Sequence, residues 1–105
     1  MRIENIKING IYRPMGYLME SIRLSCVVKD AKGKEVALVN VEVSDREDFS
    51  NILFRVEGKL DTACIPLELE TLPRTRYFAR VTVIDDAADT ATGETWFETG
   101  KQDVI

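Results

Sequence analysis

Apolar residues recur at every second position along most of this sequence, and this alternation restricts the fold more than any other feature. The stretch RYFARVTVI is the clearest case, and its alternate apolar residues are Tyr77, Ala79, Val81 and Val83. Successive side chains of a strand point to opposite faces, so such a stretch buries one face and exposes the other. No segment sustains the apolar spacing of an amphipathic helix. We therefore predict an all-β chain.

Seven such stretches are separated by segments rich in turn residues. We expect strands at 4–9, 21–28, 36–43, 52–58, 63–70 and 76–84, and a last strand that carries Phe97 and Thr99. The Gly-containing segment 29–35 is interpreted as a hairpin turn between the second and third strands. In the strand at 63–70 the residues expected to point inward are Ala63, Ile65, Leu67 and Leu69. Pro66 lacks a backbone donor, so this strand is expected at a sheet edge.

Seven short strands in a chain of 105 residues predict a fibronectin type III or immunoglobulin-like β-sandwich of about seven strands. The segment LPRTRY supports it. A Leu-Pro turn followed by a tyrosine at the opening of the penultimate strand is the pattern of a tyrosine corner, in which the Tyr77 hydroxyl bonds to backbone a few residues upstream. The alternative is that Tyr77 is simply a core aromatic residue.

Composition and charge exclude several classes of protein. The chain has 14 Lys and Arg against 18 Asp and Glu, a net charge of −4, and its basic residues are scattered, whereas a nucleic-acid-binding domain needs a basic stripe. No apolar run is long enough for a membrane span, and the first residues lack the apolar segment of a secretory signal. We expect neither nucleic acid nor membrane as a partner.

The two cysteines bear on the compartment. The alternation points Cys26 inward and Cys64 outward, so we expect no disulfide between them. Unpaired cysteines fit a reducing compartment slightly better than an oxidising one. The cytoplasm is therefore slightly favoured, and the compartment stays open.

Candidate chemistry is sparse, and the chain has no histidine. Glu68 and Glu70 are two positions apart on one predicted strand face, about 6.6 Å between Cα atoms, which is near the low end for the carboxylate pair of an inverting glycosidase. An open, solvated face tunes neither carboxylate. Three aspartates in the last turn, Asp85, Asp86 and Asp89, could supply carboxylate oxygens to calcium, but their spacing follows no known calcium loop and turns favour Asp for their own reasons. We predict no catalytic, cofactor-binding or metal-ligating residue in this chain.

The residues expected to point outward on three neighbouring strands are unusually apolar. They are Leu38, Phe78, Ile84 and Trp96. A contiguous exposed apolar patch marks a docking surface, whereas scattered exposed apolar residues are normal in monomers. We predict that these four residues form a face that packs against another domain or a second copy of the chain.

Short motifs follow one another in an order that points to a family. They are NIKIN at 5–9, RPMG at 13–16, IRLSC at 22–26, EGKL at 57–60, TRYFARVTVID at 75–85 and FETG at 97–100. In this order the whole chain resembles the N-terminal fibronectin-like domain of bacterial α-L-rhamnosidases, which are multidomain glycoside hydrolases. Cys26 and Ala79 stand where that family usually has tryptophan, so a thinner core is expected unless neighbours such as Phe54 compensate.

The resemblance implies a non-catalytic accessory domain, because the catalytic carboxylates of that family lie in a helical barrel of which this chain contains no part. It implies a folded domain at 1–100 and the start of a linker at 101–105, with other domains of the same polypeptide as partners. The alternative is a module that acts alone and binds carbohydrate or protein. The aromatic residues available to a sugar are Tyr12, Tyr17, Phe78 and Trp96.

Overall fold

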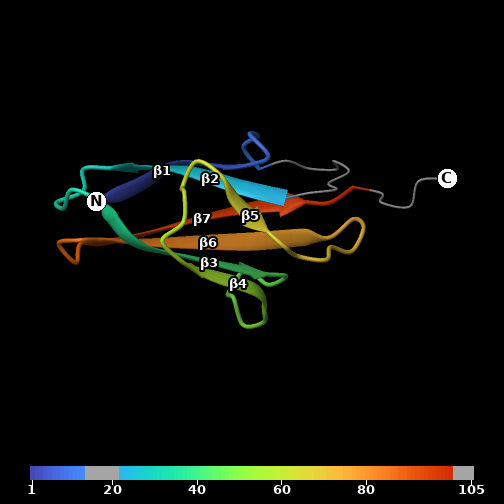
Figure 1. The fold of residues 1–105 in the computed structure, drawn as a ribbon. Coiled ribbons are helices and arrows are strands. Elements are labelled where there is room, and N and C mark those ends of the chain that lie inside the picture. The colour runs from blue at the N-terminus through green and yellow to red at the C-terminus, as the bar shows by residue number, and fades with distance from the viewer. Residues whose placement is uncertain (14–21, 101–105) are drawn as a thin grey trace.

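The computed structural model describes residues 1–13 and 22–100, which form two antiparallel β-sheets packed face to face (Figure 1). The strands are β1 (Arg2–Ile8), β2 (Ile22–Lys29), β3 (Val36–Ser44), β4 (Ile52–Gly58), β5 (Ile65–Leu67), β6 (Arg76–Asp85) and β7 (Thr90–Glu98). One sheet has the order β1-β2-β5 and the other the order β4-β3-β6-β7. The predicted all-β, immunoglobulin-like sandwich of seven strands is confirmed.

The core lies between the sheets and is built from the inward residues of the alternating stretches. The fully buried side chains of the four-stranded sheet include Val39, Val41, Val43, Ala79, Val81 and Val83. Tyr77 and Phe97 are its largest buried side chains, and their rings stack with centroids 5.4 Å apart. Phe54 is half-buried and packs against this core. It therefore adds aromatic volume to a core that holds Cys26 and Ala79.

The predicted hairpin at 29–35 is wrong, because β2 and β3 lie in different sheets. Both edges of β2 are occupied by β1 and β5, and both edges of β3 by β4 and β6, so the two strands cannot pair. The connection crosses from one sheet to the other and is tied to the β6–β7 turn. There the backbone N–H groups of Gly33 and Lys34 donate to the carboxylates of Asp85 and Asp86, each at 2.8 Å.

The strand predicted at 63–70 is shorter than expected and covers only Ile65–Leu67. It lies at a sheet edge, as Pro66 indicated. Ala63 is exposed rather than inward, since its N–H donates to the Asp61 carboxylate at 3.0 Å and leaves the ladder. At the other end, the N–H of Leu69 bonds to the carbonyl of Leu67 at 2.9 Å, which ends the strand in a local turn.

Two further features concern cysteines and the last strand. Cys26 is buried and Cys64 exposed, as the alternation predicted, and both thiols are free. Burial raises the pKa of the Cys26 thiol. The last strand, β7, begins at Thr90 and ends at Glu98, so it carries Phe97 as predicted, whereas Thr99 lies buried directly after it. The predicted linker at 101–105 lies outside the described residues.

Candidate functional site

The four residues of the predicted docking face lie on the outer side of the four-stranded sheet, where β3, β6 and β7 are neighbours. Leu38 stands opposite Ile84, and Phe78 opposite Trp96. Phe78 and Ile84 are six residues apart on β6, a separation of about 20 Å along a strand. All four side chains are half-buried. The structure therefore brings them together as two apolar pairs, one at each end of β6.

The Trp96 pair lies among arginines. The guanidinium of Arg76 is 4.2 Å from the centre of the Trp96 ring, and that of Arg13 is 5.9 Å from it. Arg76 is held in place because its Nε donates to the Glu98 carboxylate at 2.7 Å. A cation over an indole ring is attracted by the electron-rich ring face. The Trp96 ring is therefore already engaged by two cationic side chains.

A shallow hollow of about 250 Å³ adjoins this pair and is also lined by Phe49 and Glu47. Phe49 is buried beneath Arg80, whose guanidinium lies 4.3 Å from the ring centre. Arg80 in turn donates to the Glu42 carboxylate at 3.1 Å. This end of the outer face thus combines aromatic rings with paired charges.

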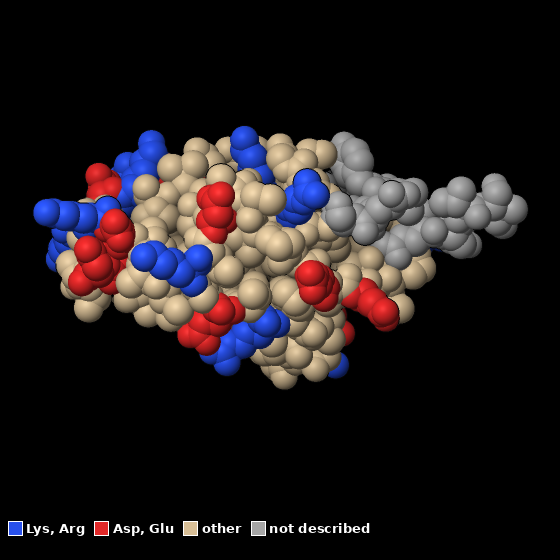
Figure 2. All heavy atoms as spheres, in the orientation of Figure 1, with Lys and Arg blue, Asp and Glu red and all other residues tan. Residues whose placement is uncertain are grey.

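Figure 2 shows basic and acidic side chains interspersed over the face that it presents, with no continuous basic stripe among the described residues there.

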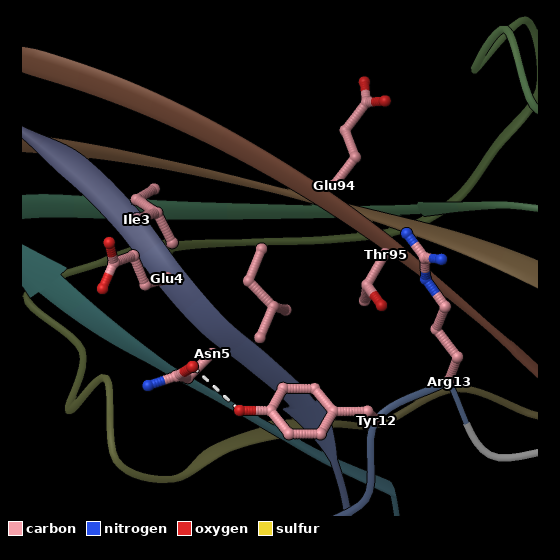
Figure 3. A pocket seen from close by; sticks show the side chains of 8 residues that line it. Ile3, Glu4, Asn5, Tyr12, Arg13, Glu94 and Thr95 are labelled. Carbon is pink, nitrogen blue, oxygen red and sulfur yellow. Dashed lines mark hydrogen bonds between the residues drawn. The ribbon is translucent and has the colours of Figure 1, made fainter.

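A second hollow, of about 380 Å³, lies between β1 and β7 (Figure 3). Its lining residues are Ile3, Glu4, Asn5, Ile6, Tyr12, Arg13, Glu94 and Thr95. The Tyr12 hydroxyl donates to the side-chain oxygen of Asn5 at 2.8 Å, and the Lys7 ammonium lies 4.9 Å from the Tyr12 ring centre. The two hollows share Arg13, Glu94 and Thr95. The two hollows are therefore adjacent on the surface, with Tyr12 lining one and Phe78 the other.

The paired glutamates do not lie on one strand face, because β5 ends at Leu67. Glu68 and Glu70 follow it as exposed residues. Within the described part of the chain, no group of three acidic, cysteine or histidine side chains is placed to hold a metal ion. Nor does any described helix have the length and apolar character needed to cross a membrane.

The carboxylates of the three turn aspartates accept hydrogen bonds from other groups of the protein. The Asp85 carboxylate accepts backbone N–H groups of Gly33 at 2.8 Å, Ala87 at 2.9 Å and Asp89 at 2.8 Å. Burial raises the pKa of Asp85, but these hydrogen bonds outweigh it and hold that pKa below its usual value. The Asp89 carboxylate accepts a hydrogen bond from the terminal ammonium of Met1 at 2.9 Å, which lowers the pKa of Asp89. These contacts give the DDAAD cluster a structural role, because they tie the β6–β7 turn to the 29–35 connection and to the N-terminus. We call this set of contacts the clasp.

Tyr77 has the geometry expected of a tyrosine corner. Its side chain is buried, and its hydroxyl accepts the backbone N–H of Leu72, five residues upstream, at 2.8 Å. On the other side of the same segment, Thr99 Oγ1 donates to the carbonyl of Leu72 at 2.5 Å. The segment before β6 is thus fastened both to β6 and to the end of the described chain.

One apolar surface was missed at the level of the sequence. Leu72 is 67% exposed and Leu53 is 43% exposed, and with Leu69 they line a hollow of about 310 Å³ at one end of the sandwich. In the sequence, Leu72 belongs to the turn signal LPRTRY. Its backbone is held by hydrogen bonds with Tyr77 and Thr99, and the period of two cannot predict these.

Comparison with known proteins gives one family and several structures. Residues 3–103 match the family described as Rha78A-like, N-terminal immunoglobulin domain. No curated protein matches the chain. The chain is similar to part of an α-L-rhamnosidase from Streptomyces avermitilis, solved in complex with L-rhamnose, with 26% identity and a TM-score of 0.76 over 94% of this chain and 10% of that one.

Two further structures share the fold. An α-L-rhamnosidase from Dictyoglumus thermophilum has 20% identity and a TM-score of 0.78 over 96% of this chain and 12% of that chain. Murine CRIg has 14% identity and a TM-score of 0.50, covering 94% of this chain and 98% of its own. The chain therefore spans about a tenth of the length of the two rhamnosidases. Because the family match covers nearly every residue, the chain belongs to the Rha78A-like N-terminal immunoglobulin domains.

Proposed function

We propose that this chain is a non-catalytic accessory domain of an α-L-rhamnosidase and that its role is structural, holding and orienting neighbouring domains. The observation that carries the proposal is the family match over residues 3–103. The two similar rhamnosidases support it, since an equivalent domain makes up only 10% and 12% of their chains. The rest of such an enzyme then supplies the chemistry.

The described surface supports a role without catalysis. Glycoside hydrolysis needs two carboxyl groups that flank one substrate bond in a shaped pocket. Here Glu68 and Glu70 are exposed beyond the end of β5, and Asp85 is occupied by backbone N–H groups. By itself the chain is therefore proposed to hydrolyse no rhamnoside.

The proposal includes a domain at 1–100 followed by a linker from 101. Gly100 is buried, and its carbonyl accepts the N–H of Arg74 at 3.1 Å, so the hydrogen-bonded structure continues to this residue. It also includes docking of a neighbour on the outer face that carries Leu38, Phe78, Ile84 and Trp96. The Phe78 and Trp96 end is the better candidate, because Arg76 and Arg13 lie near the Trp96 ring, and aromatic and arginine side chains are enriched at interfaces.

The first test is to read the coding sequence beyond the codon for Ile105. An open frame that continues for several hundred residues into a helical-barrel pattern supports the proposal. An immediate stop with no hydrolase gene beside it counts against it. The longer product, with and without residues 1–100, should then be assayed on an aryl α-L-rhamnoside. We expect the 105-residue chain alone to be inactive, and turnover by it above contaminant level would revive an enzymatic function.

Carbohydrate binding by this domain is the second candidate function. The observation that favours it is the pair of adjacent hollows, one lined by Tyr12 and the other by Phe78 and Trp96, with Arg13 in both. Tyr17, also named as a candidate, lies outside the described residues. Against it, two guanidinium groups already lie near the Trp96 ring. Titration with L-rhamnose, followed by calorimetry and by the fluorescence of the single tryptophan, distinguishes the two functions, since a purely structural domain shows no saturable change.

A further inference from the structure

The end of the sandwich that carries Leu72 has the features of a prepared contact surface. Leu53, Leu69 and Leu72 are named here the Leu72 cluster, and they line the hollow of about 310 Å³ described above. Leu72 has the highest exposure among the large apolar side chains of the described residues. In Figure 1 the β5–β6 connection, which carries Leu72, lies at the same end of the sandwich as the end of β7.

The exposure of Leu72 does not come from a loose backbone. Its N–H donates to the Tyr77 hydroxyl at 2.8 Å, and its carbonyl accepts from Thr99 Oγ1 at 2.5 Å. An apolar side chain whose backbone is already fixed loses little conformational freedom when it is buried by a partner. The Leu72 cluster is therefore preformed for docking.

The position of the end of the domain indicates which polypeptide would dock on the Leu72 cluster. Thr99 and Gly100 are bonded to the segment that carries Leu72, through Thr99 N–H to the Thr75 carbonyl at 3.0 Å and Arg74 N–H to the Gly100 carbonyl at 3.1 Å. Any polypeptide that continues past Gly100 therefore starts beside the Leu72 cluster. A short tether holds a following domain at an effective concentration of the order of millimolar, which favours docking on the nearest apolar surface.

The charges around the hollow indicate the chemistry of its partner. The charged residues that line it are Asp45, Glu68 and Glu70, all acidic and all exposed. Within the part of the chain that the structure describes, no basic side chain forms an ion pair with any of them. An interface with complementary charge would present Lys or Arg here.

We propose that the Leu72 cluster is the interface with the domain that follows Gly100 in the same polypeptide, and that this domain presents apolar side chains flanked by Lys or Arg. This inference rests on the proposed function, because it requires a following domain. It goes beyond it by naming a second docking surface, separate from the outer face of the four-stranded sheet, and the chemistry of its partner.

The test uses the longer gene product and limited proteolysis. Lys101 gives trypsin a cleavage site directly after Gly100, and a docked domain shields that site. We expect Leu72→Ser to speed cleavage there by about tenfold, the change that a 1.4 kcal/mol loss of docking produces. Val27→Ser is the matched control, because Val27 is an exposed apolar residue on the outer face of β2, in the other sheet. High salt should also speed cleavage in the parent protein, since it screens exposed charge pairs.

Each outcome has one meaning. If the reading frame continues into a hydrolase and Leu72→Ser cleaves no faster than Val27→Ser, the docking surface is wrong and the proposed function stands. If the frame stops, both are overturned. If sedimentation shows that the 105-residue chain forms a dimer that Leu72→Ser dissociates, the occupant is a second copy and the inference is overturned. Equal urea midpoints for Leu72→Ser and the parent 105-residue chain exclude unfolding as the cause of faster cleavage.

Discussion

Replacing Tyr77 by phenylalanine removes one hydroxyl from the tyrosine corner and keeps the aromatic ring. Tyr77 is 2% exposed, and its ring stacks on Phe97, so the packing of the core is retained. The atom that is lost accepts the N–H of Leu72 at 2.8 Å. A hydrogen bond of this kind contributes about 0.5–1.5 kcal/mol, and a buried donor left unpaired costs about 1–3 kcal/mol.

The bond is only partly buried, and water reaches the Leu72 N–H in part after the substitution. We therefore expect a loss of about 1.5 kcal/mol, between these two limits. With an m-value of about 1.5 kcal/mol/M in urea, the midpoint falls by about 1 M. The melting temperature of a domain of this size falls by about 4–8 °C for each kcal/mol.

Urea titration followed by the fluorescence of Trp96, the single tryptophan of the chain, measures the midpoint directly. Tyr12→Phe is the matched control, because the Tyr12 hydroxyl also makes a 2.8 Å hydrogen bond but the residue is 56% exposed. Such a surface change alters stability by no more than about 0.5 kcal/mol. Equal midpoint shifts for the two variants would refute the reasoning. A changed m-value would show that Tyr77→Phe alters the denatured state or the two-state transition.

Three further predictions concern the clasp and the cysteines. Gly33→Ala should destabilise the domain by about 1–3 kcal/mol in thermal unfolding, because the new Cβ would stand 1.9 Å from Asp86 Oδ1 and 3.0 Å from the backbone nitrogen of Ala87; an unchanged melting temperature contradicts this. The pKa values of Asp85 and Asp89 lie below their usual values, so their contribution to stability is present above about pH 4 and is lost as the pH falls through the lower folded-state pKa values. Asp85→Asn should therefore be less stable at neutral pH and show a weaker dependence on acid pH, and parallel stability curves for variant and parent would exclude the clasp as the cause. Exposed Cys64 should react with a thiol reagent at once, whereas Cys26, with its burial and its raised pKa, should react only in urea; rapid reaction of both thiols in the native protein would show that the two sheets open.

The period of two was sufficient to predict which side chains of each strand point into the core. It placed Val39, Val81 and their neighbours in the core because inward and outward positions follow from strand geometry alone. It failed for the connection at 29–35, because the choice between hairpin and crossover depends on which strands occupy the edges of β2 and β3. The loop is then held by Asp85 and Asp86, about fifty residues later in the chain. Those carboxylates satisfy the N–H groups of the loop, and the loop itself carries no sign of them.

For the candidate sites, too, the alternation within a strand could be predicted, whereas the contacts between strands could not. Alternation identified Leu38, Phe78, Ile84 and Trp96 as outward residues, but whether outward residues meet depends on the register between strands. That register pairs Leu38 with Ile84 and Phe78 with Trp96, and so leaves two pairs far apart on β6. Leu72 lies outside every alternating segment, so the period of two makes no prediction of its exposure. Its backbone is held by the hydrogen bond that its N–H donates to the Tyr77 hydroxyl and by the one that its carbonyl accepts from Thr99.

These hydrogen bonds join the stability of the domain to its proposed docking. Tyr77 and Thr99 hold the two backbone groups of Leu72, and Thr99 lies next to the last residue before the proposed linker. A loss of the Tyr77 hydroxyl should therefore loosen the Leu72 cluster as well as the fold. In the longer polypeptide we expect Tyr77→Phe to speed cleavage after Lys101, even where the domain stays folded. Buried Tyr77 is one of the residues that hold the backbone of Leu72. An unchanged cleavage rate would therefore mean that docking of the following domain does not depend on how that backbone is held.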